Sequence, residues 1–149
     1  YALKGNYTRY KAIKAAQYRR LEAMKDLRWV DAMVAVIKRQ KWFRWHDAGD
    51  VQSLEHLNNI YKICEATPDT RHWLPTREAW IKNELDRKPA NLVIRFSPPM
   101  MGQRVDTWPN SSMVVDTGAS CPAPNQGGKC GDCRQCWDPA VKVVSYGKH

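Results

Sequence analysis

The sequence lacks any long run of apolar residues. No stretch of 18 consecutive apolar residues occurs, so no segment has the length and hydrophobicity of a membrane-spanning helix. The first ten residues lack the apolar core and the small-residue cleavage site of a secretory signal peptide. These two absences favour a cytoplasmic protein over a membrane or secreted one.

Internal repeats and low-complexity tracts are also missing, and the chain does not begin with Met. Its 149 residues, 43% hydrophobic and 26% charged, have the composition of one ordinary globular domain. We predict a single α/β domain over residues 1–149. It consists of a basic helical region (1–40), an alternating strand and helix core (41–117), and a cysteine loop with a final strand (118–149).

Cysteine is scarce but clustered. The chain has five cysteines, and four of them lie within sixteen residues. Thiols crowded in this way in a cytoplasmic chain hold metal more often than they form disulfides. Eight residues separate the first two of the four, and two residues separate each later pair, a spacing that suits a [4Fe-4S] cluster and a zinc ion equally. The predicted metal ligands are Cys121, Cys130, Cys133 and Cys136.

A site closed by four protein thiolates has no open coordination position. This favours a structural or electron-transfer role for the predicted metal over a catalytic one. Three glycines within the loop, Gly127, Gly128 and Gly131, supply the backbone freedom that a tight metal loop needs.

The positive charge is concentrated near the start of the chain. Residues 1–45 carry twelve Lys and Arg against three acidic residues, which equals the whole net charge of +9. We expect a basic amphipathic helix here, with a buried stripe formed by Ile13, Leu21, Met24 and Leu27. Such a helix suits phosphate contacts, although a solvated basic face explains the charge as well. The nucleic-acid contact candidates are Lys11, Lys14, Arg19, Arg20, Lys25 and Arg28.

The rest of the chain alternates between strand and helix patterns. A helix is predicted at 29–38 and another at 51–64, which Asp50 would cap, and Thr76 would cap a third at 77–86. Strands are predicted at 41–46, 71–75, 91–97, 112–116 and 141–146. This order predicts a mostly parallel sheet or partial barrel of about five strands with flanking helices.

Polar residues follow several of the predicted strands. The carboxyl ends of parallel strands meet at one edge of a sheet, where ligands usually bind. We therefore expect a pocket at this edge, near the metal loop. Its candidate residues are Arg44, His46, Asp47, Asp50, Thr76, Arg77, Arg95 and Ser97.

The order of these motifs resembles the phage gene product 88 family. The family pattern is a Cys-Tyr-Ala opening followed by a basic helix, a strand ending in a His-x-Ser/Ala-Gly-Asp loop, a helix ending at a Pro-Asp turn, a strand ending in Thr-Arg/Lys, and a terminal cysteine cluster. The corresponding parts here are Tyr1-Ala2, residues 44–50, Pro68-Asp69, Thr76-Arg77 and the four cysteines. A phage origin would imply the host cytoplasm as the location.

The family in turn resembles part of a radical S-adenosylmethionine barrel. In that resemblance, cysteines before the Tyr-Ala pair would hold a first cluster. S-adenosylmethionine is therefore implied only if cysteines precede Tyr1, and we predict two or three of them directly upstream.

Three functions follow from these observations. The leading hypothesis is a phage-type accessory metalloprotein that binds nucleic acid or a nucleoprotein complex through its basic helix. The second is a radical S-adenosylmethionine-like enzyme, or a remnant of one, that uses the strand-end pocket. The third is a protein-binding inhibitor of host defence.

Overall fold

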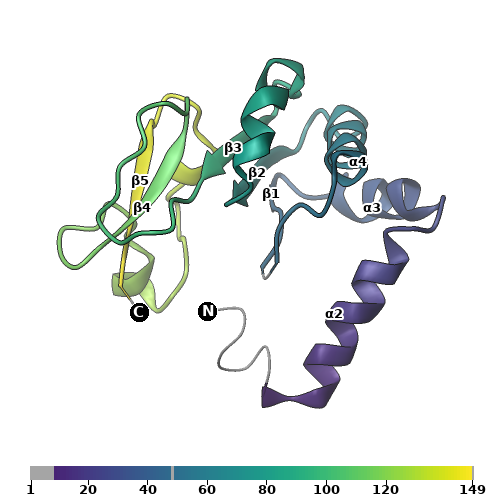
Figure 1. The fold of residues 1–149 in the computed structure, drawn as a ribbon, viewed down its shortest axis with the longest axis horizontal. Helices are drawn as coiled ribbons and strands as arrows, with labels where there is room; N and C mark the ends of the chain where they lie inside the picture. The colour runs from purple at the N-terminus through teal and green to yellow at the C-terminus, as the bar shows by residue number, and fades with distance from the viewer. Residues whose placement is uncertain (1–8, 48, 149) are drawn as a thin grey trace.

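A computed structural model describes residues 9–47 and 49–148 of the chain. Five parallel strands lie side by side in chain order and form a sheet that curls into half a barrel (Figure 1). The α/β fold class with a parallel five-stranded sheet is therefore confirmed. The strands are β1 (Trp42–Arg44), β2 (Arg71–Thr76), β3 (Leu92–Phe96), β4 (Ser111–Val115) and β5 (Val143–Gly147).

Two helices, α2 (Lys11–Ala23) and α3 (Trp29–Ile37), precede β1. Helix α4 (Leu54–Glu65) connects β1 to β2, and the 3-10 helix η1 (Ala79–Arg87) connects β2 to β3. Two predicted caps are wrong. Ser53 caps α4 by accepting a hydrogen bond from the His56 amide, because Asp50 is used elsewhere, and Glu78 holds the cap position of η1. No helix among the described residues has the length and apolar character needed to cross a membrane.

The main core lies between the sheet and the helices that cover its outer face. Side chains alternate along each strand, so Leu74 of β2 and Leu92 and Ile94 of β3 point toward the helices. There they pack with Leu57 and Ile60 of α4, and all five side chains are at most 1% exposed. Apolar contact of this kind holds the outer face together.

Helix α2 does not belong to this core. None of its residues is buried, and Figure 1 shows it extending away from the sheet. The predicted buried stripe is wrong, since Leu21 is 39% exposed and Leu27, beyond the end of the helix, is 98% exposed. The apolar positions are too few and too widely spaced to form a continuous face, so nothing draws the helix onto the body.

The sheet bends sharply between β3 and β4. These two strands share the single register pair Phe96 and Ser111, whereas β4 and β5 are paired over their full length. The bend turns β4 and β5 away from the other three strands (Figure 1). It opens a concave face, which the chain between β4 and β5 covers.

Candidate metal centre

The segment that covers the concave face contains the four clustered cysteines, and we call residues 116–142 the cysteine lobe. Its short helices are η2 (Ala123–Gln126) and η3 (Gln135–Trp137). The Trp137 indole nitrogen donates to the carbonyl of Phe43 in β1 at 3.0 Å, and its ring meets the edges of Trp42 and Trp73. These contacts dock η3 against β1 and β2.

Arg95 of β3 joins the lobe to the sheet. Its side chain is 0% exposed and points away from the helix-covered face, since its neighbour Ile94 belongs to the outer core. Among the described residues, the guanidinium donates only to backbone carbonyl oxygens. These are Cys136 at 2.9 Å, Val141 at 2.9 Å, Ser111 at 3.4 Å, Gln135 at 2.7 Å and Asp138 at 2.8 Å.

The charge of Arg95 has no direct counter-ion among the described residues, because none of their salt bridges includes it. Burial lowers the pKa of its guanidinium, and the groups that act against this shift are Cys136, Tyr146 and Asp138, in that order. Arginine nevertheless stays protonated in proteins. The structure thus contains a buried cation beside a thiol.

One of the four clustered thiols, that of Cys136, lies close enough to this cation for each group to affect the pKa of the other. Cys136 is 8% exposed and packs with Trp73 and Val144, and Cys121 contacts the same cluster. The amide of Cys133 donates to the carbonyl of Cys130 in a turn at 3.0 Å. Burial raises the pKa of the Cys136 thiol, and the charges of Cys121 and Cys130 act on it in the same direction.

The thiols are neighbours but not an assembled ligand set. All five cysteines are free, and within residues 9–47 and 49–148 no group of three or more His, Cys, Asp or Glu side chains has the geometry of a metal site. Cys130 is exposed on a loop that runs through left-handed Gly128 and Gly131. A loop of this kind can rearrange at low cost.

The strand end of β1 gathers some of the predicted pocket residues. One carboxylate oxygen of Asp50 accepts from the Thr76 hydroxyl at 2.7 Å, and the other accepts from the Arg77 amide at 2.7 Å. Asp50 thus ties the loop after β1 to the end of β2. His46, whose φ of 52° is the only positive value among the described non-glycine residues, lies close enough for its pKa to respond to Asp50.

The other predicted pocket residues lie elsewhere. The ring of Trp73, on the concave side, lies beneath the Arg44 guanidinium at 5.0 Å, and Arg44 also pairs with Asp47 at 3.7 Å. The Ser97 and Ser112 hydroxyls share a hydrogen bond at 2.8 Å. His46 contacts His56 of α4, on the side of the sheet that the helices cover, whereas Arg95 contacts the cysteine lobe, so the described residues do not form the single pocket that we expected.

His56, on the first turn of α4, is a member of the strand-end group that the sequence did not reveal. Its ring meets that of His46 at 5.4 Å, and burial, followed by the charge of His46, lowers its pKa to about 4. Its Nδ1 accepts from the Gln52 amide, so Nε2 carries the proton. That Nε2 and the Nδ1 of His46 are both buried, and neither has a hydrogen-bond partner among the described residues.

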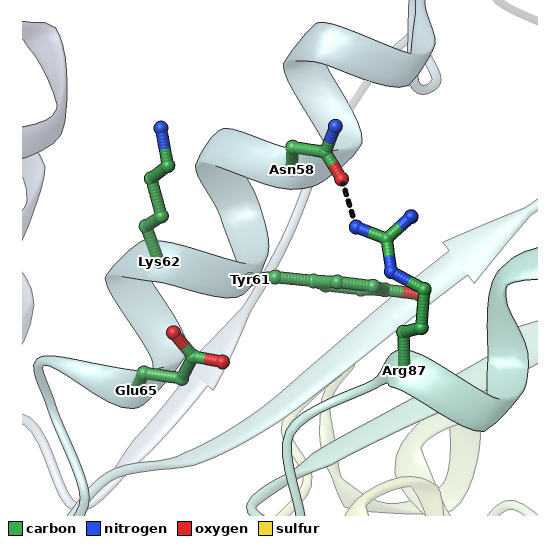
Figure 2. Close-up of a pocket in the computed structure, with 5 residues that line it drawn as sticks. All are labelled: Asn58, Tyr61, Lys62, Glu65 and Arg87. Atoms are coloured by element: carbon green, nitrogen blue, oxygen red, sulfur yellow. Dashed lines mark hydrogen bonds between the residues drawn. The ribbon is translucent and has the colours of Figure 1, made fainter.

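A shallow polar groove lies on the outer side of the molecule, between α4 and η1 (Figure 2). Arg87 crosses it and donates to Asn58 at 3.0 Å and to Glu84 at 2.8 Å. The Tyr61 hydroxyl donates to the carbonyl of Glu84 at 3.1 Å, and burial raises the pKa of Tyr61 to about 12. The groove is lined by Asn58, Tyr61, Lys62, Glu65 and Arg87, and no cysteine lines it.

The nucleic-acid candidates differ in their surroundings. Lys25 pairs with Glu22 at 2.8 Å and Arg28 pairs with Asp26 at 2.8 Å, so carboxylates neutralise these two. The other four are exposed on α2 and take part in no salt bridge with another described residue. They are Lys11, Lys14, Arg19 and Arg20.

A family model described as gene product 88 matches residues 1–103. The chain belongs to the gene product 88 family. The matched residues include β1, β2 and β3, so the family resemblance seen in the sequence is confirmed over the basic region and the first part of the half-barrel. The match ends before β4 and the cysteine lobe, and comparisons with characterised proteins and with solved structures found no significant match.

Proposed function

We propose that this gene product 88 family protein is an accessory metalloprotein that holds one metal centre in Cys121, Cys130, Cys133 and Cys136. The observation that carries the proposal is the buried charge of Arg95. A guanidinium removed from water is costly unless negative charge compensates it. No carboxylate of a described residue is in salt-bridge contact with Arg95, and the ionisable group that most strongly offsets the effect of burial on its pKa is the Cys136 thiol.

Four thiolates around a zinc ion, or around a [4Fe-4S] cluster, carry net negative charge and would supply this compensation. The donor set fits either group, because thiolate is the ligand that both prefer. Cys121 and Cys136 already share one cluster, and the exposed Cys130 loop has the backbone freedom to close on them. When bound, the metal would cross-link the cysteine lobe internally, since all four ligands belong to it, and Arg95 would hold the backbone that carries Cys136 against the sheet.

The concave face argues for a structural or electron-transfer role. In a barrel enzyme this face surrounds the substrate, whereas here Trp137, Cys136 and the Arg95 contacts fill it. A radical enzyme would need space at this position. The metal-binding interpretation therefore fits the packing better than the enzymatic one.

Metal analysis tests this proposal. Protein purified without oxygen should contain one zinc ion or four iron atoms per chain, and Cys133→Ser should lose it. Cys64→Ser is the matched control, since Cys64 is a buried free cysteine in the outer core. Wild-type protein that contains neither metal and takes up neither from solution would refute the metal centre.

We further propose that α2 contacts nucleic acid or a nucleoprotein complex. The supporting observation is a helix with no buried residue and four exposed basic side chains outside any salt bridge with a described residue. A polar helix that has no buried residue gains little stability from packing, and contact with phosphates would stabilise it. Each phosphate neutralised also adds salt-dependent affinity.

Charge reversal tests the nucleic-acid proposal. Replacing Lys14, Arg19 and Arg20 by Glu should weaken the binding of the protein to a mixed-sequence DNA. It should also reduce the slope of log affinity against log salt concentration by about three. The matched control reverses three exposed charges outside α2, those of Lys62 in α4, Arg71 in β2 and Lys82 in η1. The two triple variants then have the same net charge. Equal loss of affinity in both triple variants would assign the effect to net charge and exclude α2 as the contact.

A further inference from the structure

We propose that Tyr146 is a positioning residue of the four-thiolate centre, whose hydroxyl donates a hydrogen bond to the sulfur of Cys136 and thereby raises metal affinity. This inference rests on the metal centre proposed above. It concerns how the centre is tuned rather than whether it exists, and the experiment below separates the two.

The contact between the two residues is direct. The Tyr146 hydroxyl oxygen lies 3.1 Å from the Cys136 sulfur. Between two neutral groups either atom could donate, but a metal-bound thiolate has no proton. In the loaded protein the phenol is therefore the only donor, and the thiolate accepts a charge-assisted hydrogen bond.

The sheet, rather than the cysteine lobe, positions the phenol. Tyr146 lies on β5, which pairs with β4 over five residues on one side. Two hydrogen bonds between Ser120 and Ser145 hold the strand where the lobe begins, at 2.7 and 2.9 Å. The donor is thus fixed before the thiols assemble, an arrangement that makes the hydrogen bond effective.

The four thiols would not be equivalent in such a centre. Cys136 is 8% exposed, shares a hydrogen bond with the Tyr146 hydroxyl and lies beside the buried Arg95 charge, whereas Cys130 is exposed to solvent. Donors around a ligand sulfur withdraw electron density from it and stabilise the reduced form of an iron-sulfur cluster. Tyr146 and Arg95 would act at Cys136, and Cys130 would remain open to water.

Removing the hydroxyl tests the inference. Tyr146→Phe deletes one oxygen and keeps the ring. Tyr61→Phe is the matched control. The Tyr61 hydroxyl also donates a hydrogen bond of 3.1 Å, to the carbonyl of Glu84, but it lies on the outer face of the sheet. The readouts are a cobalt(II) titration without oxygen, which reports thiolate-to-metal charge transfer, and a zinc competition with a chromophoric chelator.

We expect Tyr146→Phe to bind zinc about 10-fold more weakly than the wild type. Its thiolate-to-cobalt band should move to longer wavelength, because a sulfur without a hydrogen bond gives up electrons more easily. The Tyr61→Phe protein should match the wild type in both readouts. If the isolated protein holds an iron-sulfur cluster, Tyr146→Phe should lower its reduction potential.

Two failures are distinguishable. A wild-type protein with no thiolate-to-cobalt band refutes the metal centre itself. A wild-type band that Tyr146→Phe leaves unchanged, with unchanged zinc affinity, refutes the role of Tyr146 and leaves the centre standing. If Tyr146→Phe does not fold, Tyr146→Gln is the second variant, because its side-chain amide restores an N–H donor. A thiolate-to-cobalt band and a zinc affinity identical to those of the wild type would then support donation to Cys136. A band at longer wavelength together with a 10-fold loss of zinc affinity would contradict it.

Discussion

Both faces of the half-barrel sheet are buried, but different groups bury them. On the outer face, aliphatic side chains of β2, β3 and α4 pack against one another at 0% to 1% exposure. On the concave face, a small cluster around Trp73, Cys136 and Val144 is supplemented by one arginine that binds five carbonyl oxygens. Burial of aliphatic side chains is favourable without any further group, whereas a buried cation needs negative charge to compensate for its loss of water.

This difference divides the protein into a part whose stability comes from apolar packing and a part whose stability depends on a partner for the buried cation. The outer core includes strands within the residues that match the family model, and the cysteine lobe follows them. We infer that the first part folds through apolar burial, and that the lobe docks fully only when negative charge reaches Arg95. Four experiments can break or sharpen this contrast.

The largest effect is expected from the loss of the buried cation. Arg95→Met keeps much of the volume but leaves several carbonyl oxygens of the lobe without a donor, so we expect a loss of about 3–5 kcal/mol in the free energy of unfolding. Urea denaturation measures this loss. Arg71→Met, an exposed change on β2, is the control and should stay within about 0.5 kcal/mol of the wild type.

The next effect distinguishes two kinds of cysteine. Cys133→Ser should lower the melting temperature of metal-loaded protein and have little effect once a chelator is present, because its contribution depends on the metal. Cys64→Ser places a hydroxyl in the apolar outer core, so it should destabilise by about 1–3 kcal/mol whether or not metal is bound. Equal chelator dependence of the two variants would contradict the contrast.

The outer face should respond to acid. Burial lowers the pKa of His72, as of His56, to about 4, below the value of about 6.5 for an unfolded chain. Both histidines are neutral when folded, so their contribution is complete above pH 6.5 and is lost as the pH falls toward 4. His56→Gln should reduce the slope of stability against pH in this window by about 1 kcal/mol per unit. The measurement is made with a chelator present, and an unchanged slope would exclude His56 as a source.

The smallest effect is expected in α2. Because none of its residues is buried, reversing Lys14, Arg19 and Arg20 to Glu should change the free energy of unfolding by less than about 0.5 kcal/mol. Thermal denaturation measures this change. A loss of several kcal/mol would mean that α2 packs on the body, and the nucleic-acid proposal would lose its structural support.

The order and direction of the strands could be predicted from the sequence because local patterns fix them. β-branched and aromatic runs marked all five strands, and the helical spacing from Val51 to Cys64 marked α4. The caps were harder to predict, since Asp50 and Ser53 are both good capping residues. Only the tertiary position of Thr76 and Arg77 commits the Asp50 carboxylate to β2.

The candidate site was less predictable. Sequence spacing identified the four cysteines, but it did not reveal that Arg95 and Tyr146 lie beside Cys136. Those contacts join residues 41 and 10 positions apart through the bend in the sheet. Strand alternation would have separated Arg95 from His46, because Ile94 is apolar and faces the helices, whereas carboxyl-end reasoning alone placed both residues in one pocket.

The central claim is that metal holds the cysteine lobe against the concave face, and hydrogen exchange tests it most directly. Amide exchange is compared in metal-loaded protein and after chelation without oxygen. We predict faster exchange after chelation in residues 116–142 and unchanged protection in α4, β2 and β3. Identical exchange of the lobe in both samples, or a loss of protection throughout the chain, would contradict the account.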